Sequence, residues 1–444
     1  MTVHPPDRRD RPLRQYLHRC LHPLLSLVFG MAILLATGCS HGQSSAAGEW
    51  LSEQSLEDGI PVVRTVSGSL WRGGARLELE ASIGAATQDE AYLLGDVRGY
   101  DWCDGALCIL DGQTHSVRVY SDEGRHVRDI GRLGAGPGEF RNPRGLTWDG
   151  FRKRLVVRDV RLLRLNIYTL AGDPITHWPI PQTEALAHPP VVISDSLVYL
   201  PIHLSSPLDV MDTTEGVIVL GPEGATGDTL TLPLIDHPAR SIYSLEGLIN
   251  FPVPFTPRYV WAIDAAGRFV CGVSDTYRLE VHEAGEKVLI IEKEDEPVPT
   301  KREEREWWRE AWTRVVRSND EDWTWNGPPI PRLKAPYKFI VLDGENRIWV
   351  WRSGQGRDQS DHIDPEEASP LDPLWLEETV IDVFTYEGGY LGELELPGEE
   401  MLKDPPFWPR PVVSGDRLIL CLQTEDGTPV VNCYRLIVPV HPGR

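Results

Sequence analysis

The sequence predicts an all-β protein assembled from six repeated units. Three observations carry this prediction. The 444 residues include 40 Gly, 37 Pro and 15 Trp but only four Met, a composition typical of turn-rich β proteins. Short apolar runs alternate with turns rich in Gly, Asp and Ser, as expected for strands joined by tight connections. Two stretches also repeat the same order of residues, and an internal repeat takes precedence over other signals.

The clearest repeat relates residues 82–102 to residues 129–148. The first copy contains Ser82-Ile83-Gly84, Glu90, Tyr92, Val97-Arg98-Gly99 and Trp102, and the second contains Asp129-Ile130-Gly131, Glu139-Phe140, Pro143-Arg144-Gly145 and Trp148. Glycine permits the positive φ angles of tight turns, and Pro143 lacks an N–H, which suits the first residue of a strand. Each copy is therefore a strand, a glycine-rich loop and a second strand.

Six tight turns divide the chain into units of the same kind. They are Asp104-Gly105, Asp149-Gly150, Ser194-Asp195-Ser196, Asp264 to Gly267, Asp343-Gly344 and Ser414-Gly415-Asp416. Six four-stranded units predict a six-bladed β-propeller over residues 60–440. The last unit, from Arg410, lacks a fourth strand, and the run Arg76 to Ile83 has no unit of its own. We therefore expect pairing of N- and C-terminal strands to close the ring.

One amphipathic helix is expected, at about residues 300–318. Thr300 to Glu303 has the pattern of a capping box. Apolar residues follow on one face at helical spacing: Trp307, Trp308, Ala311, Trp312, Val315 and Val316. The helix is expected to cover exposed blade edges, or alternatively to bind a partner or act as a lid.

The second repeat resembles the NHL-repeat and TolB-like six-bladed propellers. The shared features are the loop GPGEF at Gly136 to Phe140, the following Pro143, the turn Asp149-Gly150 and a strand ending in Asp159. The resemblance covers roughly residues 60–438 and is cleanest in the first two units. It implies the fold but no single activity, because such propellers include protein-binding modules, RNA-binding modules and enzymes.

Residues 1–38 have the features of a secretory signal peptide. Five Arg lie between Arg8 and Arg19, and an apolar run from Leu24 to Leu35 follows. The small residues before Cys39 resemble a bacterial lipobox, which implies cleavage before Cys39 and a lipid on that cysteine. Ser40 after the cysteine resembles outer-membrane lipoproteins. We expect an exported lipoprotein held in the outer membrane or cell envelope by a tether over residues 39–59; the alternative is an uncleaved signal anchor.

The acidity of the chain excludes one class of partner. The formal charge is −22, and residues 1–38 carry five Arg and two Asp, so the remainder carries −25. Nucleic-acid recognition needs a basic surface, so we expect no nucleic-acid partner. Net acidity of this size mainly favours solubility.

Export implies an oxidising compartment. Two pairs of cysteines are candidates for disulfides across hairpin turns: Cys421 with Cys433, around Gly427, and Cys103 with Cys108, around Asp104-Gly105. Cys271 is left over and is expected to be a small buried residue. None of these cysteines has the spacing of metal ligands.

The extra length of the chain falls in connections that share one face of the propeller. These are residues 201–214 and 352–376, between second and third strands, and residues 235–254, 296–334 and 397–408, between units. Variable loops on a rigid scaffold are where binding sites are usually built. The elaborated face is therefore the expected functional face.

A ring of cations marks the starts of the innermost strands on that face: Arg98, Arg144, His188, Arg258, Lys338 and Arg410. Arg matches carboxylate, phosphate or sulfate in bidentate geometry, so these residues are candidate ligands for an anionic group. The alternative is structural: each Arg could pair with an Asp that ends a second strand, such as Asp111, Asp159 or Asp275.

These observations predict a binding or scaffold module without a cofactor, rather than an enzyme. Its ligand would be a peptide, a saccharide or another envelope protein. The alternative is a metal-assisted lyase or hydrolase on the same face, where His115, His188, His203 and His362 are expected. Three converging histidines would bind zinc, as in the propeller lyases that the fold resembles.

Two other metal sites are less favoured. The acidic residues Asp361, Asp364, Glu366 and Glu367 are more typical of a solvated loop than of a metal site. Gluconolactonase-like propellers hold calcium at the channel mouth, and the Arg residues at those positions argue against it here.

Overall fold

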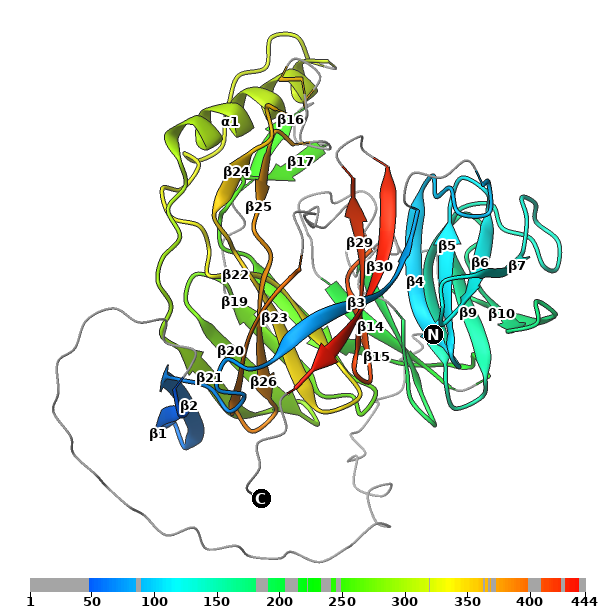
Figure 1. Ribbon diagram of the computed structural model, residues 1–444, viewed down its shortest axis with the longest axis horizontal. Helices are drawn as coiled ribbons and strands as arrows, with labels where there is room; N and C mark the ends of the chain where they lie inside the picture. The colour runs from blue at the N-terminus through cyan, green and yellow to red at the C-terminus, as the bar shows by residue number, and fades with distance from the viewer. Residues whose placement is uncertain are drawn as a thin grey trace, which may run out of the picture. The chain divides into compact units, whose positions relative to one another are not determined.

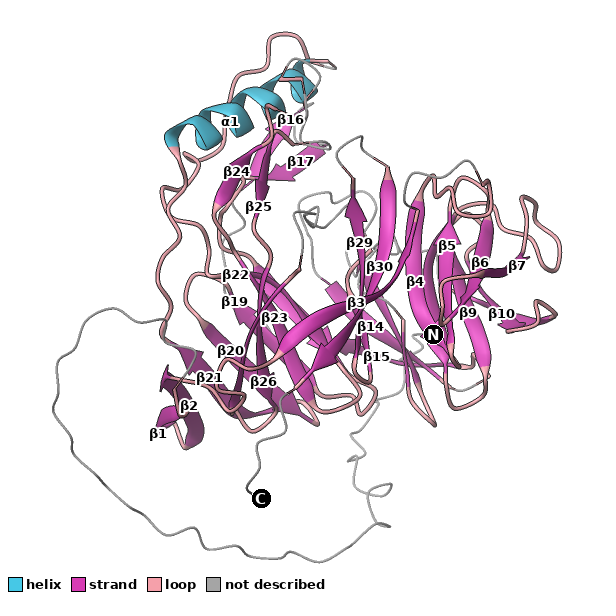
Figure 2. Cartoon of the chain, viewed as in Figure 1, coloured by secondary structure: helices cyan, strands magenta, loops and turns pink. Residues whose placement is uncertain are grey.

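The computed structural model describes residues 48–84, 89–180, 191–203, 215–221, 223–232, 241–244, 249–318, 320–361, 364, 365, 368, 373–397, 409–424 and 428–438. Strands dominate these residues, and α1 is the one helix among them (Figures 1 and 2). The strands form six blades around a common axis, as predicted for a six-bladed β-propeller.

Each blade is an antiparallel sheet whose innermost strand comes first. Blade 1 holds β4 (Val97–Cys103), β5 (Ala106–Asp111), β6 (Ser116–Ser121) and β7 (His126–Ile130). Blade 2 holds β8 (Pro143–Asp149), β9 (Arg154–Asp159), β10 (Arg164–Thr169) and β11 (Pro174–Pro179). Blade 3 holds β12 (Val192–Ile193), β13 (Val198–His203), β14 (Glu215–Leu220) and β15 (Thr226–Thr231).

The second half of the chain repeats this order. Blade 4 holds β18 (Tyr259–Ile263), β19 (Phe269–Val273), β20 (Arg278–Glu283) and β21 (Glu286–Lys293). Blade 5 holds β22 (Tyr337–Leu342), β23 (Arg347–Arg352), β26 (Val380–Thr385) and β27 (Tyr390–Glu395). Blade 6 holds β28 (Val412–Ser414), β29 (Arg417–Gln423) and β30 (Pro429–Ile437), with β3 (Arg76–Ile83) as its fourth strand.

Blade 6 combines segments from the two ends of the described chain. β3 pairs antiparallel with β30, from Arg76 opposite Ile437 to Ile83 opposite Val431. Figure 1 shows the two strands side by side, one blue and the other red. The N-terminal run without a unit of its own therefore supplies the strand that the last unit lacks.

The segment before β3 differs from the prediction. Residues 39–59 were expected to be a tether, but β1 (Leu51–Glu57) and β2 (Ile60–Ser67) form a hairpin. β2 pairs in parallel with β21, which widens blade 4 to six strands. The leucines of β1, Leu51 and Leu56, are exposed, so no buried apolar face predicts this strand. Backbone pairing with β2 stabilises it.

Neighbouring blades pack through apolar faces, and their inner strands approach closely. Val260, Ala262 and Val270 of blade 4 form one cluster with Ile340 and Val350 of blade 5. β4 lies so close to β8 that a Cβ on Gly99 would sit 2.8 Å from the backbone nitrogen of Leu146. Glycine is the residue that this approach requires.

Three insertions far apart in sequence assemble into one substructure, which we call the cap. The cap consists of the hairpin β16 (Ser241–Ser244) and β17 (Ile249–Pro252), the helix α1 (Arg302–Arg317), and the hairpin β24 (Gly356–Asp358) and β25 (Trp375–Glu377) (Figure 1). Trp312 and Val316 pack against Ile242, and Trp307 packs against Trp375. The helix thus contacts the two small hairpins rather than the blade edges that it was expected to cover.

The predicted N-terminus of the helix is displaced by one residue. Lys301 is the N-cap, and its backbone N–H donates to Glu304 Oε2 at 3.2 Å. The Thr300 hydroxyl, expected to cap the helix, instead donates to the carbonyl oxygen of Pro331 at 2.6 Å. Among the described residues, no helix combines the length and apolar character needed to cross a membrane.

The cysteines of the described residues are buried thiols, and none forms a disulfide. The two-residue turn at Asp104-Gly105 puts Cys103 opposite Ala106, so Cys108 lies diagonally from it. Cys421 faces Val431 in the same way, and Cys433 faces Ile419. The thiols of Cys103 and Cys108 nevertheless contact each other through a side-chain hydrogen bond, and the disulfides stay predictions for both pairs.

A buried carboxylate links the inner strands of blades 1 and 2. Asp101 of β4 accepts the backbone N–H of Trp148 in β8 and that of Trp102, each at 2.7 Å. Burial raises the pKa of Asp101 to about 6, and the two hydrogen bonds offset this only in part.

Asp101→Asn should therefore change how stability depends on pH. Because the folded state holds the Asp101 proton more tightly than the unfolded chain, this group's contribution to the free energy of unfolding falls as pH rises from about 4 to about 6. Asp101→Asn removes this titration. The difference in the free energy of unfolding, variant minus wild type, should therefore rise by up to about 3 kcal/mol between about pH 4 and about pH 6.

Urea unfolding at a series of pH values measures this difference. Asp122→Asn, in the exposed turn that follows β6, is the matched control, because Asp122 forms no ion pair among the described residues, and it should give a flat difference. A flat difference for Asp101→Asn as well would contradict the raised pKa.

Candidate functional site

Three of the predicted cations occupy equivalent β-bulges at the starts of inner strands. Arg98 is the extra residue between Val97 and Gly99, which face Asp111 and Leu110. Lys338 is the extra residue between Tyr337 and Phe339. In blade 2, Arg144 and Gly145 together face the single residue Arg158. A bulge re-aims its side chain, so the fold treats these three positions alike.

The loops that lead into these bulges are held by buried oxygens. The Asp111 carboxylate accepts the backbone N–H groups of Gly95 and Asp96, at 3.3 and 3.2 Å. The Asp159 carboxylate accepts those of Arg141 and Asn142, at 2.7 and 3.2 Å. These aspartates thus hold the backbone at the starts of β4 and β8.

The structural alternative for the ring of cations was pairing with these aspartates. Asp111 forms its ion pair with Arg118 of the third strand, at 3.6 Å, instead of with Arg98. Among the described residues, Asp159 and Asp275 likewise form no ion pair with Arg144 or Arg258. The ring is therefore not explained by pairing with the ends of the second strands.

Arg98 is nevertheless a partnered side chain. Its Nε donates to Asp96 Oδ2 at 2.6 Å, and its Nη1 donates to Asn142 Oδ1. The contact with Asn142 joins blade 1 to the loop before blade 2. Arg98 therefore has a structural role in addition to its charge.

Arg144 has neither a hydrogen-bond partner nor an ion-pair partner for its guanidinium among the described residues. Burial lowers its pKa, and the neighbouring charge of Arg98 lowers it further, while Asp96 acts in the opposite direction. The charges of Arg98 and Arg144 thus oppose each other, while Asp96 forms its ion pair with Arg98. This arrangement leaves a net positive charge at the starts of β4 and β8.

Lys338 is neutralised by the cap. Its Nζ lies 3.1 Å from Glu377 Oε2, while the buried Lys334 lies 3.3 Å from Glu377 Oε1. Lys334 also pairs with Glu304 of α1 at 2.7 Å. Two lysines and two glutamates therefore anchor the cap to blade 5, and Lys338 adds little net charge to the ring.

Arg410 reaches toward the axis of the propeller. Its Nη1 lies 3.5 Å from the carbonyl oxygen of Trp261 in blade 4, and its buried Nε has no partner in the described part of the chain. Blades 4 and 6 are not neighbours, so a side chain that joins them lies close to the axis. Burial lowers the pKa of Arg410, and Glu215 opposes this.

The Arg258 backbone N–H donates to Ser274 Oγ at 3.0 Å. Ser274 thus holds the start of the inner strand in blade 4, as Asp111 and Asp159 do in blades 1 and 2. In the described part of the chain its guanidinium has no hydrogen-bond or ion-pair partner. Arg258 therefore resembles Arg144, as a half-buried cation without an internal counter-ion.

Arg158 is a further cation that the sequence reasoning missed. Its side chain is 2% exposed, its Nη2 donates to the carbonyl oxygen of Pro201 at 3.3 Å, and its Nε has no partner among the described residues. Burial lowers its pKa to about 10. A signal was present: Arg158 in RLVVRD stands where ALCILD has Leu110, an apolar position. It faces the bulge that carries Arg144.

We call Arg144, Arg158, Arg258 and Arg410 the mouth arginines. All four start or flank inner strands, and none has a carboxylate partner within hydrogen-bonding distance among the described residues. A half-buried guanidinium without a counter-ion keeps unused donors in a medium of lowered dielectric constant, where an anion is bound more strongly than in water. Each of these side chains offers hydrogen-bond donors, and none is a nucleophile.

The remaining candidates are not brought together in the described part of the chain. His188 and His362 lie outside the described residues, as do Glu366 and Glu367, and only the backbone of His203 is described. His115 lies in the turn after β5 with a φ of 54°, and its Nδ1 is 3.3 Å from the carbonyl oxygen of Gln113. Cys39 also lies outside the described residues.

Comparisons with known proteins agree with the architecture. A family model described as a 6-bladed beta-propeller, DUF5128, matches residues 83–183, which include blades 1 and 2. No curated protein matches the chain. A DUF4221-family protein from Bacteroides vulgatus has a TM-score of 0.51 at 15% identity, over 82% of this chain and 99% of that one. A Bacteroides fragilis protein predicted to be exported has a TM-score of 0.43 at 12% identity, over 82% and 95%.

The six-bladed β-propeller is thus the class to which the chain is assigned. At identities of this size a structural likeness concerns the fold alone, and function must be argued from the site. The comparisons support six blades, and the resemblance to NHL-repeat and TolB-like propellers stays a prediction.

Replacing Arg158 by an apolar residue should stabilise the protein. A buried, poorly hydrogen-bonded charge is costly, so Arg158→Met should raise the free energy of unfolding by about 1–2 kcal/mol. Arg118→Met is the matched control, because Arg118 is also buried but pairs with Asp111. Its loss should lower the free energy of unfolding by about 3–5 kcal/mol.

Urea unfolding of both variants tests the comparison. If Arg158→Met destabilised the protein as strongly as Arg118→Met, Arg158 would be a structural tie between blades 2 and 3 and not an unsatisfied cation.

Proposed function

We propose that the protein is an exported lipoprotein whose NHL-like propeller binds an anionic ligand at the mouth arginines. The observation that carries the proposal is the set of guanidinium groups left without carboxylate partners on a chain that is otherwise strongly acidic. Excluding residues 1–38, the chain has a formal charge of −25, so it contains many Asp and Glu residues with which these arginines could have paired. Their absence from the described surroundings supports a role other than structural pairing.

The ligand chemistry follows from the donor groups. Guanidinium groups bind planar or tetrahedral oxyanions in bidentate geometry. A carboxylate of a peptide, or a carboxylate or sulfate of a saccharide, meets this requirement. A long polyanion such as a nucleic acid does not, because the net charge of the chain is strongly negative and would repel it.

The second part of the proposal is lipidation at Cys39. It rests on the basic segment, the apolar run and the small residues that precede Cys39 in the sequence. Lipid chains at that position would hold the propeller on a membrane surface and leave its binding face to soluble or envelope-bound partners.

The mouth arginines should set the affinity for anions. Arg144→Gln and Arg258→Gln should each weaken binding of a bound anion about tenfold or more, because a hydrogen bond to a charged group contributes about 1.5–3 kcal/mol. Titration calorimetry with inorganic sulfate, a polyglutamate peptide and a uronic-acid oligosaccharide measures this effect at two salt concentrations.

Arg125→Gln is the matched control. Arg125 is exposed in the turn between β6 and β7 and pairs with Glu123, so its loss should leave affinity unchanged. The anion hypothesis fails if none of the three probes binds, or if Arg125→Gln weakens binding as much as Arg144→Gln.

Cys39→Ala should release the protein from membranes. Without the lipid-bearing thiol the chain loses the acyl anchor, so fractionation of cells should find it in the soluble fraction, and labelling with a fatty-acid analogue should be lost. Cys20→Ala, within the signal segment, is the control and should remain lipidated. Membrane retention of Cys39→Ala without label would instead indicate an uncleaved signal anchor.

A further inference from the structure

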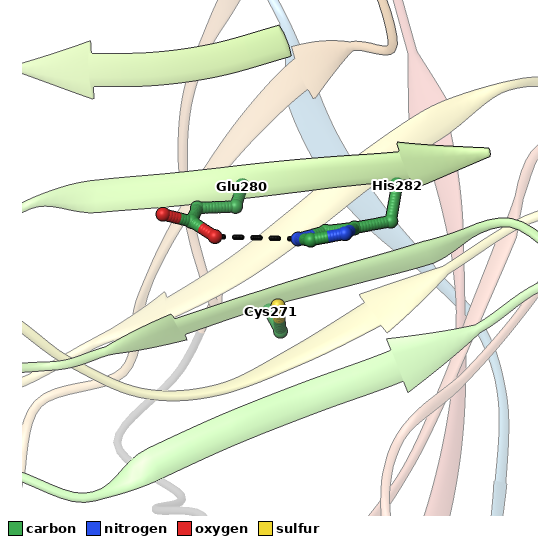
Figure 3. A group of neighbouring side chains, drawn as sticks. All are labelled: Cys271, Glu280 and His282. Atoms are coloured by element: carbon green, nitrogen blue, oxygen red, sulfur yellow. Dashed lines mark hydrogen bonds and ion pairs between the residues drawn. The ribbon is translucent and has the colours of Figure 1, made fainter. Parts of the chain in front are cut away.

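Three side chains in blade 4 form a cluster that the mouth arginines do not involve. Cys271 of β19 and Glu280 and His282 of β20 each offer one ligand atom, and these atoms lie within 4.8 Å of one another. Figure 3 shows the Glu280 carboxylate pointing toward the His282 ring, with the Cys271 sulfur beneath them. The chain thereby brings a sulfur, a nitrogen and an oxygen ligand to one place.

The sheet register explains the convergence. Cys271 lies directly opposite Glu280 in the pairing of β19 with β20. His282 is two residues farther along β20, and alternate residues of a strand point to the same face. Opposite residues in adjacent strands have Cβ atoms about 5 Å apart, so the three side chains share one face of one hairpin.

The cluster is buried between blades 3 and 4. Cys271 is 0% exposed and packs with Tyr199 and Val217 of blade 3, and His282 is 7% exposed. The Tyr259 hydroxyl hydrogen-bonds to the Cys271 sulfur. A ligand at this place would be shielded from solvent and from large molecules.

The charges of the cluster suit a divalent cation. Glu280 supplies a carboxylate that contacts both His282 and Lys287. Lys287 Nζ holds Glu280 Oε1 at 2.9 Å, which leaves Oε2 directed at His282 Nε2 at 3.2 Å. A thiolate, a carboxylate and a neutral imidazole would together balance the two charges of the ion.

The geometry needs only small movements. Zinc binds Cys, His and carboxylate ligands at about 2.0–2.3 Å in a tetrahedral arrangement, which places ligand atoms about 3.3–3.8 Å apart. The sulfur, nitrogen and oxygen atoms therefore need to approach one another by at most about 1.5 Å. Mixed sulfur and imidazole ligands select zinc over calcium or magnesium, which prefer oxygen ligands.

We propose that Cys271, Glu280 and His282 form a zinc site that joins β19 to β20 where blade 4 packs against blade 3. Zinc binding converts the Cys271 thiol to a thiolate, and the proton leaves to solvent. The fourth position is filled by water or by the Tyr259 hydroxyl. The zinc site is buried, so its role is structural. His282 lies two residues before Ala284, in the turn between β20 and β21, and this turn is away from the starts of the inner strands. The zinc site is therefore separate from the mouth arginines.

Metal binding to the full-length protein tests this proposal. The protein is purified with a non-thiol reductant, stripped with a chelator and titrated with Zn²⁺ against a chromophoric indicator, and separately with Co²⁺. The expected results are one Zn²⁺ per chain, a higher melting temperature with zinc, and a thiolate-to-cobalt charge-transfer absorption. Cys271→Ser and His282→Gln should each lose all three signals.

Two further variants sharpen the test. Cys433→Ser removes another buried thiol, in blade 6, and should keep all three signals. Lys287→Gln should keep the cobalt absorption and weaken zinc affinity by about 10–100-fold, as expected for a residue that orients a ligand.

His282→Gln keeps a side-chain amide that can bond to Glu280, so it serves as the decisive variant if Cys271→Ser does not fold. The proposal is overturned if the wild-type protein binds no stoichiometric zinc at micromolar concentration. It is equally overturned if zinc still binds to His282→Gln with unchanged affinity and absorption. Neither result bears on the anion-binding test.

Discussion

In blades 1, 2 and 4, a buried oxygen at the end of the second strand holds the backbone at the start of the inner strand. Asp111 and Asp159 are fully buried, and their carboxylates bind the backbone of the incoming loop. Ser274 does the same in blade 4 with its hydroxyl. Because the backbone claims these oxygens, the adjacent arginines are positioned by the loop without being neutralised by it. The repeat that builds the propeller therefore also leaves positive charge at one end of its axis.

Much of the fold was predictable because its determinants are local. The Asp/Gly turns and the alternating apolar runs fix blades 1 to 6, and α1 follows from the spacing of Trp307, Ala311 and Trp312. β1 was missed since its leucines are exposed and its order depends on pairing with β2. Each cysteine pair lies diagonally rather than directly opposite, because one residue in the length of a turn shifts which side chains face each other.

The repeat predicted which positions carry the cations, but not which residues pair with them. The bulges place Arg98, Arg144 and Lys338 alike, as the repeat indicated, yet their partners differ. Arg98 is paired by the nearby Asp96, Lys338 by Glu377 from a distant insertion, and Arg144 by no described residue. Such differences depend on contacts between segments far apart in the sequence. Only Arg158 carried an overlooked local signal, a charge at an apolar strand position.

The pairing of β3 with β30 in blade 6 affects the order in which the chain folds. β3 leaves the ribosome about 350 residues before β30, the strand with which it pairs, so this contact has a very large sequence separation and forms slowly. Until then β3 is an unpaired strand, and Leu79 on it remains exposed even in the finished blade. A chain that crosses a membrane during export would present this strand long before its partner β30, so a chaperone that holds unfolded chains could bind it.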